Sequence, residues 1–222
     1  MFDFWFLSPG LDFWSAVAIL ASDIFAILII LPFREISHIW LSHFFSGYKF
    51  ELKHYPLLDF FDPIGSLCML LFGYGWPKRF PYFIDQPSSR LEYVLVYLIG
   101  SAFTFLSSIL FNIVLNLLII TKVTGISWVA WIVKFINNLI LVNIRLTVIN
   151  LLPIPNLDGF KICEAFIPRR LIDSYLRYQF VIGLTLSFML IMGVFNFPIM
   201  IMESLVFGLV HFISRIPFVF FL

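Results

Sequence analysis

The residue types able to do chemistry in this sequence gather in two short segments. The first is Arg34-Glu35-Ile36-Ser37-His38, which places a guanidinium, a carboxylate and an imidazole at the end of a long apolar run. The second covers residues 150–159 and ends in a carboxylate, Asp158, and a glycine. Ionisable side chains within or beside a membrane span are costly, and by default they mark a functional site. The simpler alternative for the first segment is that Arg34 and Glu35 only reach towards water from a helix end.

The second segment predicts a carboxylate on a rigid kink. Pro153 and Pro155 each lack an N–H and restrict the residue before them, so a helix cannot continue through them. Gly159 then allows the backbone to turn tightly beside Asp158. An ordinary proline-rich helix end with a terminal aspartate is the alternative that this segment alone leaves open.

The elements that must position these residues are apolar helices. Of 222 residues, 61% are hydrophobic and 12% charged, whereas soluble domains have about 45–50% and about 25%. The apolar runs exceed the roughly 20 residues that cross a bilayer as a helix. A net charge of +1 argues against nucleic-acid binding. Cys68 and Cys163 lie in apolar segments at no metal-like spacing, which argues against a zinc ribbon or a disulfide framework. The sequence therefore predicts an all-α polytopic membrane protein, whose first partner is the lipid bilayer.

We expect a single membrane-embedded domain over residues 1–222, with about five to six transmembrane helices. The first apolar stretch has no basic residue before Arg34, so it lacks the charged start of a signal peptide and should remain as a span. Residues 57–76 are interrupted by aspartate, proline and glycine, which predicts a re-entrant or interfacial hairpin after the first span. The expected helices cover residues 11–33 (continuing past Ser42), 91–120, 127–152, 178–195 and 197–222, the last of which spans the bilayer or lies along its surface.

The distribution of lysine and arginine predicts the orientation. Basic residues are absent before the first span, and they gather in residues 34–90 and 158–177. The positive-inside rule then places the N-terminus outside and both basic regions in the cytoplasm. The segment around His38 and the segment around Asp158 therefore lie on the same side of the membrane, where they can meet.

These motifs resemble those of the site-2 proteases, which are intramembrane zinc metalloproteases. The family signature Asn-x-x-Pro-x-x-x-Leu-Asp-Gly is matched at Asn150, Pro153, Leu157, Asp158 and Gly159, and the family's His-Glu-x-x-His helix is similar to residues 34–38. Asn143 is similar to a residue of the family's preceding helix. Residues 62–67 and 75–78 resemble the hairpin that small bacterial members have between the two motifs. The resemblance covers about residues 30–165, in the family's order.

The resemblance implies a zinc-dependent peptidase. It would make His38 and Asp158 zinc ligands and Glu35 the general base. The zinc would lower the pKa of its bound water and polarise the scissile carbonyl. The substrate would be a membrane-spanning helix of another protein, in a bacterial inner membrane, with the site near the cytoplasmic face.

The sequence departs from the family pattern at the first zinc ligand. Arg34 stands where the family has a histidine, and an arginine has no lone pair to offer a metal. Thr104 stands where the family has an asparagine on its middle helix. Three residues could complete an altered ligand set: His43, His54 or Glu35 itself, and in the last case no obvious base would remain.

Three hypotheses follow. In the first, the chain is an active or weakly active intramembrane metalloprotease with altered ligands. In the second, it is a catalytically inactive pseudoprotease that binds transmembrane helices, with Arg34 replacing the zinc charge through carboxylate pairs. In the third, it is a transporter or channel lined by polar residues such as Asp23, Lys134 and Arg145, although many transporters have an inverted repeat that is not found here.

Overall fold

Every regular element that the structure describes is helical. The computed structural model describes residues 12–47, 57–72, 75–78, 89–121, 127–154, 157–168, 171–172, 177–178, 181–182, 185, 188–189, 192–194 and 196–218. The main helices are α1 (Phe13–Phe25), α2 (Leu31–Ser46), α3 (Pro63–Phe72), α4 (Arg90–Ile120), α5 (Ser127–Asn150), α6 (Asp158–Glu164) and α9 (Asn196–Arg215). A π-helix, η2 (Ala26–Ile30), joins α1 to α2, and the short 3-10 helices are η4 (Leu57–Phe60) and η6 (Ile216–Phe218).

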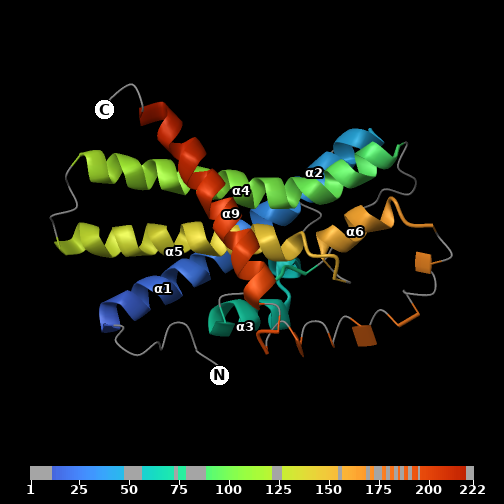
Figure 1. Ribbon diagram of the computed structural model, residues 1–222, viewed down its shortest axis with the longest axis horizontal. Helices are drawn as coiled ribbons and strands as arrows, with labels where there is room; N and C mark the ends of the chain where they lie inside the picture. Colours follow the sequence, from blue (N-terminus) through green and yellow to red (C-terminus); the bar gives the residue numbers. More distant parts are fainter. Residues whose placement is uncertain are drawn as a thin grey trace.

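Two long helices form the centre of the molecule. Helices α4 and α5 lie side by side, and α9 crosses over both of them (Figure 1). Helix α1 packs along α5, while α2 packs along α4. One apolar cluster joins η2 to the middle of α5 through Ala26, Ile30, Leu139 and Val142. These contacts bring the end of the first long helix to the end of α5, where the polar segments lie.

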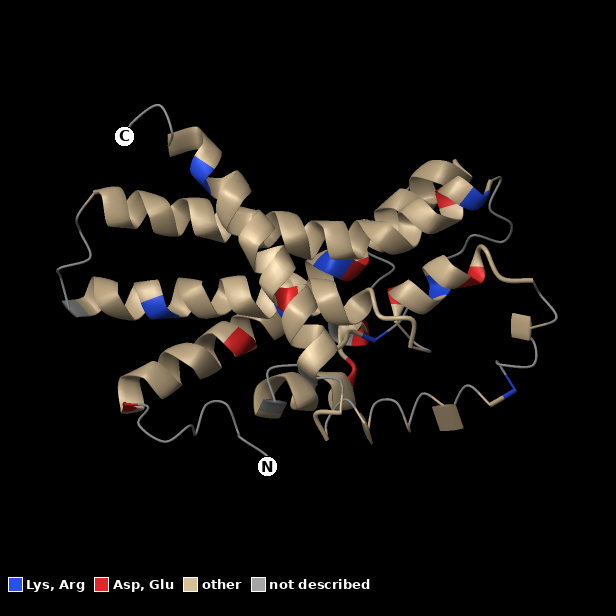
Figure 2. Cartoon of the chain, in the orientation of Figure 1, with Lys and Arg blue, Asp and Glu red and all other residues tan. Residues whose placement is uncertain are grey.

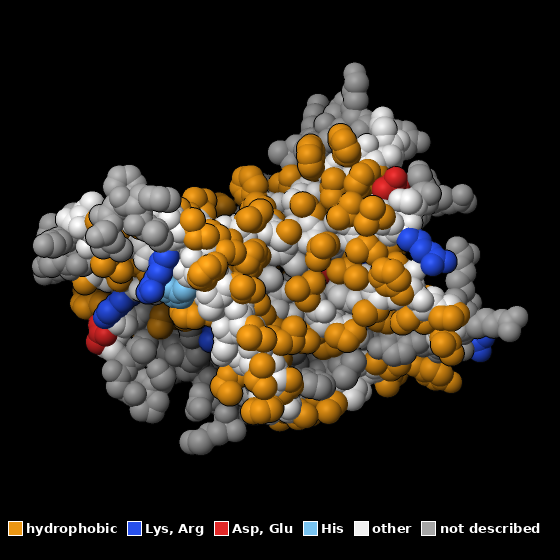
Figure 3. All heavy atoms as spheres, turned by 45° about the horizontal axis from the view of Figure 1, so that its top comes forward, with side chains coloured by type: hydrophobic (Ala, Val, Ile, Leu, Met, Phe, Trp, Pro, Cys, Tyr) orange, Lys and Arg blue, Asp and Glu red, His pale blue; other side chains and the backbone are white. Residues whose placement is uncertain are grey.

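The lengths and compositions of four described helical segments are suited to crossing a membrane. They are Phe13–Ser46, Arg90–Ile120, Trp128–Asn150 and Phe197–Phe218. Apolar side chains cover much of the face seen in Figure 3. The predicted all-α membrane fold is confirmed. The predicted number of five to six spans stays a prediction, because half of the expected helix 178–195 lies outside the described residues.

The first helix continues well past the apolar run, as expected. Helix α1, the π-helix η2 and helix α2 form one continuous helical segment of 34 residues. It ends where Gly47 adopts a left-handed backbone conformation with φ of 71°, which glycine reaches at little cost. The π-helix was not anticipated from the sequence. Because π turns change the helical period, η2 alters the direction in which the side chains of α2 point.

The predicted hairpin folds back on itself around a short helix. Helix α3 has 10 residues, or about 15 Å at 1.5 Å per residue, too short to cross the bilayer. A β-carbon on Gly75 would collide with the carbonyl oxygen of Gly65 and lie 2.6 Å from the Met69 β-carbon. The backbone N–H of Lys78 donates to the carbonyl of Phe60 at 3.2 Å. Glycine is therefore required where the returning chain touches α3.

Figure 2 marks where the charged residues lie along the helices, and those that the transporter hypothesis names have partners on other segments. The three pairs are Asp23 with Asn138 at 3.2 Å, Lys134 with Asp12 at 3.3 Å, and Arg145 with Glu203 at 3.8 Å. Polar contacts of this kind between neighbouring membrane helices are expected from helix packing, without any transport function. It gives no support to a polar path through the membrane, so the transporter hypothesis gains nothing from these residues.

Candidate functional site

The first half of the site lies on the buried face of α2. Arg34, Glu35 and His38 have exposed fractions of 0%, 1% and 0%. Arg34 and His38 are one helical turn apart, so their side chains leave the helix on the same face. This face is turned towards α4 and the start of α6, where His38 meets the Val96 carbonyl and Arg34 meets Asp158.

The second half of the site is built where α5 ends. The helix stops at Asn150, and α6 begins at Asp158 after an extended residue, Leu157. A β-carbon on Gly159 would collide with the carbonyl of Leu151 and lie 2.6 Å from the oxygen of Leu152. Only a glycine allows the first turn of α6 to lie this close to the end of α5. The sequence predicted this close turn, and it holds the Asp158 carboxylate in the interior.

A guanidinium lies between two carboxylates at the centre of the site. Arg34 Nη1 donates to Glu35 Oε1 at 2.5 Å, and Arg34 Nη2 donates to Asp158 Oδ2. The three side chains are 1%, 1% and 4% exposed. Charge-assisted hydrogen bonds of this kind are among the stronger ones in proteins. The two sequence segments therefore meet through Arg34.

The imidazole of His38 is held from two sides. Its Nδ1 lies 2.5 Å from the carbonyl oxygen of Val96 on α4. A carbonyl can only accept, so Nδ1 carries the proton and Nε2 faces the Asp158 carboxylate at 3.5 Å. A β-carbon on Gly100 would overlap the imidazole, with His38 Cε1 at 2.7 Å. Gly100 is therefore the residue of α4 that lets the ring fit.

Comparison with known proteins supports the resemblance seen in the sequence. The model of Peptidase family M50 matches residues 16–194. The chain belongs to this family. Over 165 residues it is 30% identical to a protein of Bacillus subtilis (strain 168) described as "Putative zinc metalloprotease YwhC", covering 66% of this chain and 73% of that protein. No solved structure matches.

Membership of family M50 implies a zinc ion, so the residues present must be tested against one. A catalytic zinc usually has three protein ligands. Within the ranges that the structure describes, no three His, Cys, Asp or Glu side chains are grouped so that they could hold a metal ion. The guanidinium of Arg34 lies between the carboxylates of Glu35 and Asp158 instead, and it stays charged and has no lone pair. The residues that the structure describes do not fit a zinc ion held by three ligands.

Two features of the M50 pattern are nevertheless retained. The Nδ1 hydrogen bond to a backbone carbonyl leaves Nε2 facing the site, and metal-binding histidines in general are oriented by such a bond. His38 and Asp158 also lie side by side, as two ligands of one metal would. The arrangement therefore keeps two of the expected ligand positions and places a cationic side chain beside them.

The remaining residues expected at the site lie in different parts of the chain, and one of them is not described. Asn143 and Asn150 are buried, and their Nδ2 atoms donate to the carbonyls of Leu139 and Leu146 at 2.8 and 2.7 Å, within their own helix. Pro153 lies in the non-helical connection, so it acts on the position of Asp158 through the backbone. His54 lies outside the described residues. Asn143 and Asn150 are thus hydrogen-bonded within α5 and take no part in the ion pairs of Arg34.

Sequence reasoning missed two contributions from α4. It assigned no role to the Val96 carbonyl or to Gly100, both of which position His38. A backbone carbonyl has no sequence signal. Gly100 did have one, since it stands in the Gly100-Ser101-Ala102 run of small residues. Thr104, read only as a departure from the family, shares a hydrogen bond of 2.7 Å with Thr147 on α5.

Proposed function

We propose that this chain is a catalytically inactive member of family M50, which binds transmembrane helices of other proteins without cleaving them. The observation that supports this most is the position of the Arg34 guanidinium, between the carboxylates of Glu35 and Asp158. The residue expected to act as the general base and the residue expected to bind zinc are both engaged by the same cation. Neither is then available for the role that the family pattern gives it.

The charge balance of the site gives this arrangement a physical reason. Two carboxylates buried at membrane depth repel each other and lose their hydration, which is very unfavourable without a cation. In an active metalloprotease the metal supplies that positive charge. Here the guanidinium supplies it, so the substitution of the first ligand stabilises the site while it removes the metal.

The proposed setting is the bacterial inner membrane, with the N-terminus outside and the ion pairs near the cytoplasmic face. The positive charges of residues 34–90 and 158–177 support this orientation. The client would be a single membrane-spanning helix whose backbone is locally weakened. An intramembrane protease must unwind its substrate helix. A binding protein with the same fold can retain the preference for helices that unwind easily.

The proposal is tested with the purified protein in lipid nanodiscs and a fluorescent single-span peptide that has Asn-Gly at its centre. Saturable binding is expected, with the peptide intact after prolonged incubation with zinc. A peptide of the same length with leucine at both positions is the control and should bind more weakly. Cleavage that Glu35→Gln abolishes would overturn the inactive assignment, and equal affinity for both peptides would overturn client binding.

A second candidate function is a metalloprotease with an altered ligand set. The observation in its favour is that His38 Nε2 and the Asp158 carboxylate face each other at 3.5 Å. This function requires Arg34 to leave the position between the carboxylates and a third ligand to replace it. The peptide assay separates the two, because only this candidate predicts a product that Glu35→Gln abolishes.

A further inference from the structure

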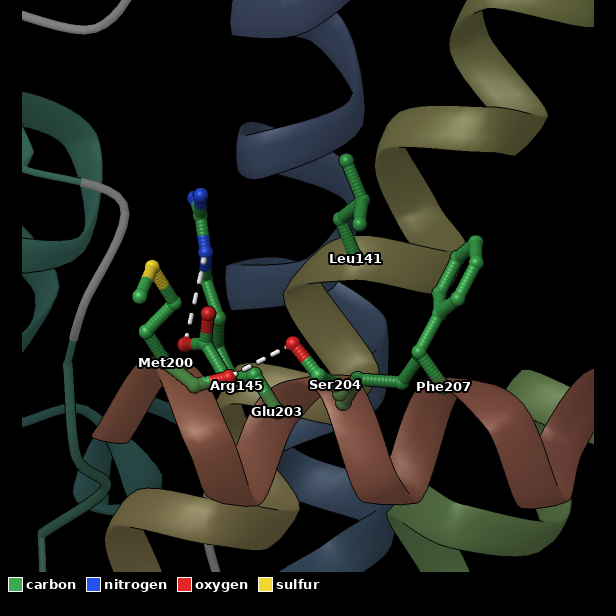
Figure 4. A pocket seen from close by; sticks show the side chains of 7 residues that line it. Leu141, Arg145, Met200, Glu203, Ser204 and Phe207 are labelled. Atoms are coloured by element: carbon green, nitrogen blue, oxygen red, sulfur yellow. Dashed lines mark hydrogen bonds and ion pairs between the residues drawn. The ribbon is translucent and has the colours of Figure 1, made fainter. Parts of the chain in front are cut away.

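A groove opens between α5 and α9. It has a volume of about 280 Å³ and is lined by Leu141, Ile144, Arg145, Met200, Glu203, Ser204 and Phe207 (Figure 4). Arg145 Nε and Glu203 Oε1 lie 3.8 Å apart, and their side chains are 20% and 21% exposed. This distance is an ion pair rather than a hydrogen bond. The groove thus presents one positive and one negative group on a surface that is otherwise apolar.

Among the described residues, α9 is the least buried of the four candidate spans. Only 17% of its most apolar window is buried inside the protein, compared with 61% for α5. Met200 and Phe207 are 57% and 39% exposed. Partly exposed charges between exposed apolar residues are costly in a lipid-facing surface unless another protein covers them. Arg145 and Glu203 already pair with each other in the single chain, and a protein that covered this face would shield that pair from lipid.

The same face of α9 permits close approach of another helix. Ser204 and Gly208 are four residues apart and lie on one side of the helix, and a β-carbon on Gly208 would meet no atom within 4 Å. The Ser204 hydroxyl donates to the Met200 carbonyl of its own helix at 2.8 Å, so it adds no polar group that needs a partner. Small residues at this spacing let membrane helices pack with their backbones close together.

We propose that this α5–α9 face, formed by Leu141, Arg145, Met200, Glu203, Ser204, Phe207 and Gly208, binds a second copy of the chain in a two-fold symmetric dimer. The charges argue for this occupant. In a two-fold interface the same patch faces itself, so Arg145 of one copy meets Glu203 of the other and the reverse. An anionic lipid headgroup would be repelled by Glu203, and an unrelated helix need not carry both charges at the required spacing.

The dimer does not depend on the proposed client binding, and it is tested by mixing two charge variants. Chains labelled with donor or acceptor fluorophores are reconstituted in liposomes at several protein-to-lipid ratios. The wild type should show energy transfer that rises with the ratio. Arg145→Glu alone and Glu203→Arg alone should each dimerise roughly tenfold more weakly, because like charges then face each other. Equal amounts of the two variants should recover transfer between them, because an acidic patch meets a basic one.

A steric pair of variants covers the case in which a charge variant fails to fold. Ser204→Leu leaves both charges in place and should abolish dimerisation with unchanged thermal stability of the monomer. Leu209→Trp adds bulk to a different, exposed side of α9 and should leave dimerisation unchanged. A monomeric wild type at all ratios, a mixture of folded charge variants that stays monomeric, or equal effects of the two steric variants would each overturn the proposal.

Discussion

Arg34 on α2 and Asp158 at the start of α6 form a buried ion pair across 124 positions of the chain. The contact closes the polar site, because it joins the end of the first long helix to the turn that follows α5. Glu35 completes the arrangement from the same helix as Arg34. The stability of this part of the fold should therefore depend on a positive charge at position 34.

Replacing Arg34 by methionine should destabilise the protein strongly. Removing one partner of a buried pair costs about 3–5 kcal/mol, because the other charges stay buried without compensation. At roughly 2–4 °C per kcal/mol, this is a loss on the order of 10 °C in melting temperature, measured by scanning fluorimetry in detergent with a metal chelator. The triple variant Arg34→Met, Glu35→Gln, Asp158→Asn should recover much of the loss. A melting temperature that the single substitution leaves unchanged would show that the pair is not important.

Gly100→Ala should displace His38 and lower stability. The added methyl group would overlap the imidazole, which is wholly buried and held by the Val96 carbonyl. Overpacking of this kind costs about 1–3 kcal/mol. Gly208→Ala is the matched control, since the same change in another long helix meets open space. Unfolding of both variants in detergent, at dilutions where the chain is monomeric and the α5–α9 face is unoccupied, should show a loss only for Gly100→Ala. Equal effects would contradict the packing described for His38.

Thr104 and Thr147 should show a measurable but small coupling. Their hydroxyl oxygens lie 2.7 Å apart between α4 and α5, and both side chains are buried. Hydrogen bonds between membrane helices contribute about 0.6 kcal/mol on average. A double-mutant cycle with Thr104→Val and Thr147→Val should give a coupling energy of this order. Additive effects of the two substitutions would show that each hydroxyl bonds only to its own helix.

Asp12 should make the start of α1 sensitive to acid. The hydrogen bond from the Ser15 hydroxyl is the largest influence on the Asp12 carboxyl and lowers its pKa below the usual 3.8, with Lys134 acting in the same direction. A group whose pKa is lowered in the folded state stabilises it above the unfolded pKa, and the effect disappears as pH falls through the folded value. Asp12→Asn should therefore lower the melting temperature slightly at pH 6, and this difference should shrink as the pH falls below 3.8 and through the lowered pKa of Asp12. A difference that persists in acid would assign it to packing instead.

The fold and the centre of the site were largely predictable from the sequence because their signals are local. Apolar length predicts spans, and the Pro153 to Gly159 segment predicts a kink with a carboxylate at its end. Loop charge placed His38 and Asp158 on one side of the membrane, and the structure brings them within 3.5 Å. The pairing of Arg34 with the carboxylates followed from the cost of buried like charges.

The rest of the site depends on packing between helices, which has little sequence signal. The π-helix η2 changes which face of α2 is turned inward, and no residue in Ala26–Ile30 is of a type that predicts a π-helix. The Val96 carbonyl reaches His38 because α2 crosses α4 at that level. The crossing of α9 over α4 and α5 creates the Arg145–Glu203 groove from residues that the sequence separates widely.

The zinc content of the purified protein tests the central claim most directly. The wild type, Arg34→His and His38→Ala would be purified in zinc-containing buffer, desalted, and analysed by inductively coupled plasma mass spectrometry. The guanidinium between Glu35 and Asp158 predicts that the wild type retains no more zinc than His38→Ala. Arg34→His should gain a stoichiometric amount, because it supplies the missing third ligand beside His38 and Asp158. A stoichiometric zinc in the wild type that His38→Ala removes would contradict the account.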